Sequence, residues 1–420
     1  MRLGKIMSYL MVAAVVLLTI VTIAVQMLMM HAESVEESTR IPGMPATVEE
    51  LTVRQEQAAP EQHSPAAVKR FSLPHVPLSR DEDRIIFTRD TGHTGECKVF
   101  TPEMNEHARQ WLEANATALQ SLDDVAKSAD ARSYIDLSHH DIGASSNQGD
   151  VWSACLLLGE QAVYHGELGE PAAAASAIST LLLTANSLRN EPLIDSQMKI
   201  IAATRVALKA LECVLNKTPL SYESLDVLSA DFAGMECREC YVRAVAGERI
   251  RALDYVDNEG DWNGEQRDFR KLFWRATYRY SISNVDRIQI VRMCEQIANA
   301  HRLPYADSVR VGDDLYEQLR RASGWKSPNC SWILMHAAVG LRCAAQEAAL
   351  VRIGCASLAI EAYRADKGDL PKQLADLVPE YLDAVPEDPF NGADLKYALS
   401  NNAYAVSSFG YDWLELSVDR

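Results

Sequence analysis

The chain is short of positive charge. It has 41 lysine and arginine residues against 58 aspartate and glutamate residues, a formal net charge of −17 at pH 7. A surface with this balance repels the phosphate backbone of nucleic acids and the anionic headgroups of lipids, so the main source of nucleic-acid affinity is missing. The composition therefore argues against a nucleic-acid partner.

Charge of either sign is absent from Ile6 to Met30. As a helix rising ~1.5 Å per residue, this stretch reaches about 37 Å, enough to cross a hydrocarbon core of about 30 Å. It is longer than the apolar region of a signal peptide, and Met30-His31-Ala32 has a large residue where a cleavage site wants a small one. We expect residues 1–30 to be a retained transmembrane anchor. A cleaved signal peptide and a buried soluble helix are the alternatives.

The charges that flank this stretch differ in sign. Arg2 and Lys5 precede it, whereas Glu33, Glu36 and Glu37 follow it. Because positive flanks stay on the cytoplasmic side, we expect a single pass through a bacterial inner membrane, with the rest of the chain in the periplasm. That external part carries about −19, since the anchor holds two basic and no acidic side chains.

Motifs of known catalytic chemistry are also missing. The sequence has no nucleophile elbow, no Walker phosphate loop and no zincin helix. The catalytic residues, if any, are therefore unknown from sequence, and no cofactor is expected. An envelope hydrolase that uses scattered carboxylates with His139 or His140 stays open as an alternative, because carboxylate pairs distant in sequence leave no pattern.

Nine cysteines are present, an odd number that leaves at least one unpaired. Several stand in apolar helical contexts, such as Cys155 and Cys355, where cysteine acts as a small core residue. The run Cys237-Arg238-Glu239-Cys240 fits a redox pair or half of a zinc site. A lone C-x-x-C without a second pair or a βαβ context is weak evidence, so packing within a helix is the favoured interpretation.

The chain then divides by composition. Residues 31–80 hold six of the 16 prolines among acidic and small residues, which predicts an extended linker that holds the folded part away from the bilayer. Thr101-Pro102-Glu103 predicts a helix start, with an N-cap and a proline at the first helical position. Residues 81–328 are predicted to be an α-helical array of solenoid or bundle type. Its expected helices cover about 101–127, 151–165, 171–188, 192–215, 221–232, 236–256, 284–301 and 311–322.

One helical pair has a clear turn signal. Val151–His165 and Pro171–Leu188 flank a short segment with Gly166 and Gly169, which predicts an antiparallel hairpin. It resembles a single tetratricopeptide unit. The 34-residue self-similarity of a full array is not found elsewhere, and at least three units in register would be needed to establish one.

Residues 329–420 differ from the preceding part in their residue pattern. A long alanine-rich helix is expected over 330–366, ended by Gly368 as a C-cap. Short apolar pieces with prolines follow, and then two segments that alternate like antiparallel strands around Ser400-Asn401-Asn402. The predicted fold is therefore mainly α, with an N-terminal transmembrane helix and a small C-terminal α+β module.

The C-terminal module resembles the globular end of type II secretion pseudopilins, especially the major pseudopilin. The residues that carry this resemblance are Tyr363, Gly368, Leu370, Pro371, Leu374, Leu377, Asp388, Pro389, Phe390, Gly392, Leu395, Tyr397, Tyr404, Ser407 and Gly410. Physically, Asp388-Pro389 predicts a turn and Gly392 a positive φ, and the two tyrosines can pack across paired strands. Unlike in that family, the anchor lies about 300 residues upstream, and the calcium loop is reduced to residues 410–413.

The external part also resembles a group of uncharacterised membrane-anchored bacterial proteins that join a helical region to this module. The resemblance covers most of residues 85–413. Its residues include Glu191-Pro192-Leu193-Ile194, Gln197, Leu211-Glu212, Pro219-Leu220-Ser221 and Gly247-Glu248-Arg249. It implies a fold and a compartment, but no activity.

Two loops offer weak metal candidates. His139, His140 and Asp141 have ligand chemistry suited to zinc, but adjacent residues rarely hold one ion well, and a solvated loop is favoured. Asp257, Glu259 and Asp261 alternate as in a calcium loop, but neither frame places both the glycine and the final glutamate. We interpret the segment as a polar loop that breaks the helices, and the following aromatic and basic segment, 267–280, as a buried helical face.

The sequence Gly247-Glu248-Arg249 falls inside a predicted helix, where glycine costs ~1 kcal/mol relative to alanine unless a close contact needs it. A helix crossing with an Arg–Glu ion pair is the favoured interpretation. A polar binding spot formed by Glu248 and Arg249 on the concave face of the array is the alternative. Because helical arrays need no catalytic residues, we expect an extracytoplasmic scaffold that binds a protein or peptide, in a secretion or envelope-assembly system.

Overall fold

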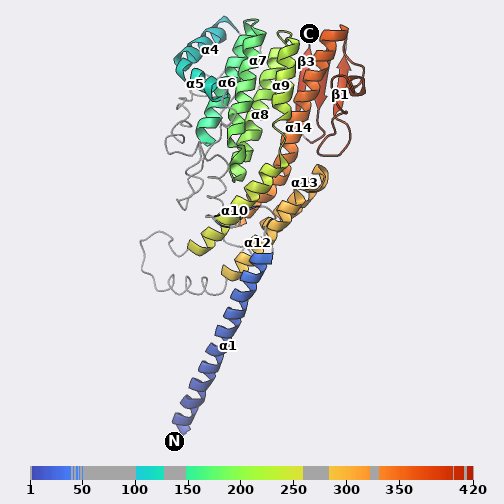
Figure 1. Ribbon diagram of the computed structural model, residues 1–420. Helices are drawn as coiled ribbons and strands as arrows, with labels where there is room; N and C mark the ends of the chain where they lie inside the picture. The colour runs from blue at the N-terminus through green and yellow to red at the C-terminus, as the bar shows by residue number, and fades with distance from the viewer. Residues whose placement is uncertain are drawn as a thin grey trace.

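The computed structural model describes the anchor region, most of the helical body and the C-terminal module (Figure 1). The described residues are 2–38, 41, 44, 45, 47, 50, 101–126, 148–258, 283–321, 331–400, 402–410 and 414–419.

The described elements are helices up to residue 377 and strands after it. The helices are α1 (Arg2–Ser38), α4 (Pro102–Ala114), α5 (Ala116–Ala126), α6 (Gln148–Glu167), α7 (Pro171–Asn186), α8 (Ile194–Leu215), α9 (Tyr222–Ala233), α10 (Arg238–Asn258), α12 (Ser283–Ala300), α13 (Tyr305–Arg321) and α14 (Ser331–Lys367). Two 3₁₀ turns are η4 (Ser187–Asn190) and η8 (Leu374–Leu377), and the strands are β1 (Lys396–Ser400), β2 (Ala403–Ser407) and β3 (Glu415–Asp419).

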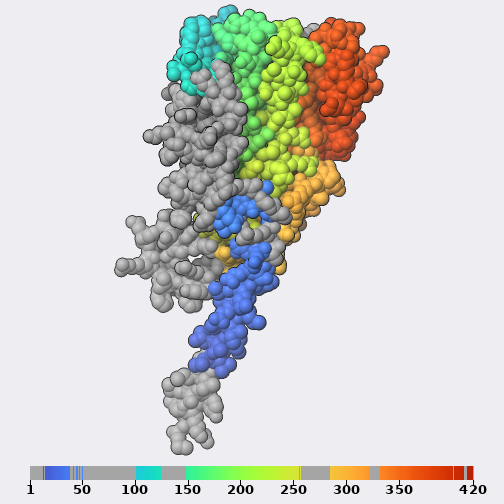
Figure 2. Space-filling model, in the orientation of Figure 1, coloured from blue at the N-terminus to red at the C-terminus, as the bar shows by residue number. Residues whose placement is uncertain are grey.

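Helix α1 holds the predicted anchor and continues beyond it. Its large apolar side chains from Val15 to Met30 are mostly exposed, and Figure 2 shows most of this helix standing clear of the described body. Past that stretch, Ala32 and Val35 are buried and α1 contacts α12. Residues 31–38 of the predicted linker are therefore helical and fixed to the body, because apolar side chains at this spacing share one helical face.

Three helices in the described part of the chain are long and apolar enough to cross a membrane. They are Val15–Glu37, Pro171–Asn190 and Trp332–Lys367. The second and third are mostly buried among other helices of the body, whereas the first is almost wholly unburied. An N-terminal apolar helix that could span a membrane is thus present, as the sequence predicted.

The predicted helix starts at Thr101 and Pro171 are confirmed, whereas two other predicted helix ends are shifted. The Thr101 hydroxyl accepts a hydrogen bond from the Met104 N–H at 3.2 Å and caps α4. Helices α6 and α7 pack as the predicted hairpin, with Pro171 opening α7. Helix α13 begins at Tyr305, earlier than predicted, and α10 continues through Asp257, where a helix break was expected.

Helix α14 is the central element of the body. It contacts α8, α9, α10, α12 and α13 as well as β2 and β3 (Figure 1). One cluster of buried side chains runs from Ile41 to Val418, so the predicted segments 81–328 and 329–420 share a core. A mainly helical body with a small sheet is confirmed, but α14 contacts elements from far along the chain, unlike a solenoid repeat, which contacts its neighbours.

The C-terminal module is a three-stranded antiparallel sheet in the order β1-β2-β3. The two predicted strands are confirmed, and β3 was not predicted. Buried Asp388 accepts hydrogen bonds from the N–H groups of Phe390 and Phe409, which forms the predicted turn. Gly392 has the expected positive φ of 71°. The ring centres of Tyr397 and Tyr404 lie 6.4 Å apart on the paired strands.

The end of the chain returns to the helical body. Asn216, just after α8, donates from its side chain to the Ser417 carbonyl at 2.8 Å and accepts from the Asp419 N–H at 2.7 Å. The sheet is therefore attached to the far end of α8, away from the end where α1 joins the body (Figure 1).

Candidate functional site

The predicted metal candidates are mostly outside the described residues. His139, His140, Asp141, Glu259 and Asp261 all lie there, as does the aromatic segment 267–280. Asp257 belongs to the last turn of α10. Within the described ranges, no group of three or more His, Cys, Asp or Glu side chains is arranged to hold a metal ion.

Gly247 marks a close crossing of α10 over the segment before α8. A Cβ atom at this position would lie 1.9 Å from the Pro192 carbonyl oxygen, a distance that no side chain tolerates. The contact is with backbone, so the neighbour cannot rotate away. Glycine is therefore required here by the approach of two backbones, as the sequence suggested.

Glu248 caps the start of α8 from the neighbouring helix. Its carboxylate accepts a hydrogen bond from the Ile194 N–H at 3.1 Å and pairs with Arg251 at 3.2 Å. The side chain is only 2% exposed. Burial raises the pKa of Glu248 to about 7, and Arg251 and the Ile194 N–H oppose the rise because they favour the charged form.

Arg249 connects the body to the anchor helix. It is 1% exposed, and its guanidinium donates to the Glu36 carbonyl at 3.1 Å. The Glu36 side chain pairs in turn with Arg287 of α12 at 3.0 Å. We call Glu36, Arg249 and Arg287 the anchor contact.

The favoured interpretation of Gly247-Glu248-Arg249 as a helix crossing agrees with this geometry, although the partner of Glu248 is Arg251. Both Glu248 and Arg249 are buried against other parts of this chain, so they do not form a polar spot open to a partner in this structure.

A chain of contacts leads from the partner of Glu248 to the surface. Arg251 lies 4.8 Å from the centre of the Trp332 ring, and Trp332 meets His336 edge-on with centres 6.1 Å apart. The His336 Nδ1 atom is 3.9 Å from a carboxylate oxygen of Asp195. Trp332 is 42% exposed. We call Asp195, Arg251, Trp332 and His336 the Trp332 patch, which joins the beginnings of α8 and α14 with the middle of α10.

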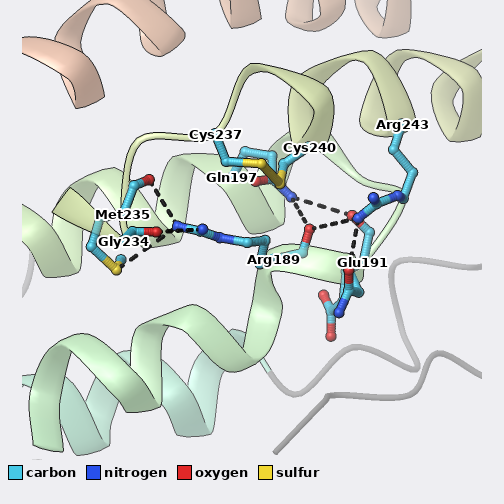
Figure 3. The surroundings of a disulfide bond; sticks show 9 residues. Arg189, Glu191, Gln197, Gly234, Met235, Cys237, Cys240 and Arg243 are labelled. Atoms are coloured by element: carbon cyan, nitrogen blue, oxygen red, sulfur yellow. Dashed lines mark hydrogen bonds between the residues drawn. A yellow bond between two sulfur atoms is a disulfide. The ribbon is translucent and has the colours of Figure 1, made fainter. Parts of the chain in front are cut away.

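A disulfide joins Cys237 and Cys240 (Figure 3). Packing was the favoured prediction for this pair, and it is wrong, because the first turn of α10 brings the two sulfurs together. Cys237 directly precedes Arg238, the first residue of α10, and is partly exposed, whereas Cys240 is 2% exposed. The prediction of packing holds for Cys155, a buried free thiol.

Arg189 holds the turn that precedes the disulfide (Figure 3). Its guanidinium donates to the Gly234 carbonyl at 2.5 Å and to the Met235 carbonyl at 2.8 Å. Arg243 of α10 reaches back to the Asn190 side chain at 2.8 Å. Burial lowers the pKa of Arg189, and the negative charge of Glu347 opposes this.

A buried polar cluster lies behind this turn. Tyr241 stacks on His301 with ring centres 5.5 Å apart, and both are fully buried. Burial raises the pKa of Glu347, on α14, to about 8, although Arg189 and Tyr241 oppose the rise. Burial, together with Arg238, lowers the pKa of His301 to about 3. Both groups are therefore mainly neutral near pH 7.

The sequence pointed to Gly247, but it did not reveal the anchor contact or the buried cluster. A usable signal for the cluster was Glu347, an ionisable residue within the apolar, alanine-rich stretch of α14. A signal for the disulfide was the Cys-x-x-Cys spacing at the start of a helix predicted over 236–256. For the Trp332 patch there was no local signal, because its residues come from three helices.

No protein-family model, curated protein or solved structure matches this chain.

Proposed function

We propose that this protein is a single-pass membrane scaffold whose helical body binds another protein or peptide outside the cytoplasm. The observation that carries the proposal is the anchor contact. Arg249 and Arg287 fix the end of α1 to α10 and α12, while Ala32 and Val35 bury their side chains in the same region. A body held in this way keeps a defined orientation to the membrane, which suits a scaffold.

The disulfide between Cys237 and Cys240 supports the proposed periplasmic location. Stable disulfides form in oxidising environments such as the bacterial periplasm and are rare in the cytoplasm. Besides Cys237 and Cys240, Cys213 is disulfide-bonded. This agrees with the periplasmic location proposed from the flanking charges of α1, in the inner membrane of a bacterium.

The Trp332 patch is the proposed contact surface for the partner. Tryptophan and arginine are enriched among residues that dominate binding energy, because they combine a large contact area with polar groups. Arg251 and Trp332 already lie against each other, and the ion pair between Arg251 and Glu248 fixes the arginine. A surface ordered before binding loses less side-chain entropy when a partner arrives.

The partner class follows from charge and resemblance. The external part carries about −19, which disfavours nucleic acid and favours a protein or peptide with basic groups. The resemblance of residues 363–410 to the major pseudopilin makes a secretion or envelope-assembly machine the first place to look. The tetratricopeptide-like hairpin α6–α7 is part of the same proposed scaffold.

Site-specific photocrosslinking in intact cells tests the proposal. A photoreactive amino acid at Trp332 is expected to give a reproducible adduct with one protein. The same probe at Tyr222, which is also an exposed aromatic but follows the opposite end of α8, is expected to give none. Equal labelling at both positions, or no adduct at either, would contradict the assignment of the patch.

A second readout separates binding from proximity. Trp332→Ala is expected to reduce recovery of the crosslinked partner with the full-length protein by at least about tenfold, the range of a hot-spot residue. Tyr222→Ala is the matched control and is expected to leave recovery unchanged.

A further inference from the structure

We infer that Cys237 and Cys240 form a redox-active disulfide that exchanges electrons with thiols, with Cys237 as the sulfur that is attacked. The inference goes beyond the proposed scaffold function, because it adds a chemical reaction at a site distant from the Trp332 patch. It rests on the accessibility of the two sulfurs, the charges around them and the way the surrounding turn is held.

Only one of the two cysteines is open to solvent, where an incoming thiol would reach it. Cys237 is partly exposed at the mouth of the turn, whereas Cys240, one helical turn later, is buried next to Tyr241. Thiol–disulfide exchange requires access of the attacking thiolate to one sulfur along the bond. The geometry therefore assigns attack to Cys237 and departure to Cys240.

The position of Cys237 favours its thiolate after reduction. It stands immediately before the first turn of α10, where unpaired backbone N–H groups and the helix dipole stabilise negative charge. Cysteines at helix N-termini and near arginine have lowered pKa values for this reason.

Arginines add positive charge near this site. Arg189 binds the two carbonyl groups just before Cys237, and Arg238 directly follows it. Two carboxylates flank the disulfide in sequence. Glu236 pairs with Arg352 at 2.9 Å and accepts a hydrogen bond from the Tyr305 hydroxyl, whereas Glu239, between the two cysteines, is exposed to solvent, which screens its charge.

The turn does not depend on the disulfide for its shape. Arg189 holds the Gly234 and Met235 carbonyls, and Arg238 donates to the carbonyls of His301 and Leu303. These bonds join the turn to η4 and to the segment after α12 without using sulfur. Reduction can therefore occur in the folded protein.

The reaction balances with a dithiol as reductant. One thiolate of the dithiol attacks the Cys237 sulfur, the bond between Cys237 and Cys240 breaks, and Cys240 leaves as a thiolate that takes up a proton. The second thiolate then attacks the dithiol's own sulfur in the mixed disulfide and releases Cys237 as a thiolate. Two electrons pass from the dithiol to the protein, and the dithiol becomes a cyclic disulfide. Of the two protons that the dithiol loses, one is balanced by the proton on Cys240 and the other stays in solvent, because Cys237 remains a thiolate.

The disulfide of Cys213 supplies a control within the same molecule, because Cys213 is buried. Full-length protein in detergent is treated with dithiothreitol at pH 7, quenched with an alkylating reagent and mapped by mass spectrometry. We expect Cys237 and Cys240 to be alkylated at least tenfold faster than Cys213, while the thermal melting curve still shows folded protein. Equal rates, or reduction only after unfolding, would overturn the inference.

Single variants test which sulfur reacts. In the Cys240→Ser protein, Cys237 is expected to react with 5,5′-dithiobis(2-nitrobenzoic acid) at least tenfold faster than Cys240 does in the Cys237→Ser protein. If a variant loses its fold in the melting curve, the wild-type mixed disulfide, trapped by alkylation and mapped by mass spectrometry, decides instead, because it forms on the attacked sulfur. Faster reaction of Cys240 would refute the assignment of Cys237 as the attacked sulfur.

Discussion

Two regions of helix α10 are held in different ways. At its beginning, a covalent bond joins Cys237 and Cys240 beside a turn that Arg189 also fixes. In its middle, around Gly247 and Arg249, no covalent bond is involved, and three neighbouring segments meet through close packing and buried polar contacts. In the first region, the Arg189 hydrogen bonds would still hold the turn if the disulfide were reduced. The middle region has no such additional bonds among the described residues.

This difference indicates which part of α10 tolerates the breaking of a bond or a substitution. A bond can open and close at the start of α10 because hydrogen bonds to backbone carbonyls keep the turn in place. In the middle, each group has a separate task, since Glu248 binds the start of α8 and Arg249 binds α1. We therefore expect substitutions in the middle region to cost more than loss of the disulfide.

The largest effect is expected for Gly247→Ala. The added methyl group would lie 1.9 Å from the Pro192 carbonyl oxygen, so two backbones must separate. We expect a loss of about 3 kcal/mol or more in unfolding free energy, the upper range for overpacking. Gly149→Ala is the control, because a Cβ there meets nothing within 4 Å. Denaturant unfolding measures both, and equal stability of the two variants would contradict the close crossing.

Arg249→Met tests the anchor contact. It keeps much of the side-chain volume but removes the hydrogen bond to the Glu36 carbonyl, and we expect a loss of about 2–3 kcal/mol. Faster amide hydrogen exchange over residues 32–38 is expected as well, because the end of α1 loses a partner. Arg310→Met, at a 75% exposed side chain, is the control. Unchanged exchange over 32–38 would show that α1 does not depend on Arg249.

Removal of the disulfide should cost less. The double variant Cys237→Ser/Cys240→Ser opens a very short loop, for which the chain-entropy relation gives about 2 kcal/mol. Because Arg189 and Arg238 still hold the turn, we expect no larger loss in denaturant unfolding. A loss above that of Gly247→Ala would reverse the ranking of the two regions.

The last expected effect is a change in the pH dependence of stability. Glu347 has a pKa of about 8 in the folded protein, above the ordinary 4.5. The folded state therefore holds a proton that the unfolded state releases between these values, so stability falls as pH rises from about 4.5 to 8. Glu347→Gln should flatten this fall, because glutamine has no proton to release over this pH range.

The control is the exposed Glu223→Gln, which should keep the wild-type profile. His301 affects stability at acidic pH. Its pKa of about 3 lies below the ordinary 6.5, so stability should also be lost as pH falls from 6.5 toward 3. Melting temperatures between pH 4 and pH 9 measure both limbs, and a parallel fall in wild type and Glu347→Gln would exclude Glu347 as the source.

Local features of the fold were readable from local residues. Thr101 and Pro102 predicted the start of α4, and the turn before Pro171 predicted the α6–α7 hairpin. Gly368, the predicted C-cap, ends α14 with a φ of 80°. Each of these depends on the backbone preferences of a few neighbouring residues. Helix α10 ends at Asn258, two residues later than predicted, and residues 259–264 of the predicted break lie outside the described part of the chain.

The candidate site was less predictable, and the reason is distance along the chain. Arg287 and Glu36 are 251 residues apart, and Arg249 and the Glu36 carbonyl are 213 apart. Nothing near any of these residues identifies its partner. The end of α1 was assigned to an acidic linker for the same reason. From sequence alone, Glu36 looks like a solvated charge, and only the structure shows its contacts with Arg249 and Arg287.

The sequence by itself determined the apolar N-terminal helix, the helical body, the hairpin of paired strands and the need for glycine at position 247. These follow from hydrophobic runs, caps and turn residues, whose effects reach only a few positions. The tertiary structure alone decided that Arg249 binds α1, that Glu347 is buried so that its pKa is raised, and that Cys237 and Cys240 differ in exposure. Burial and charge pairing depend on which distant segments pack together, and that packing is a property of the whole fold.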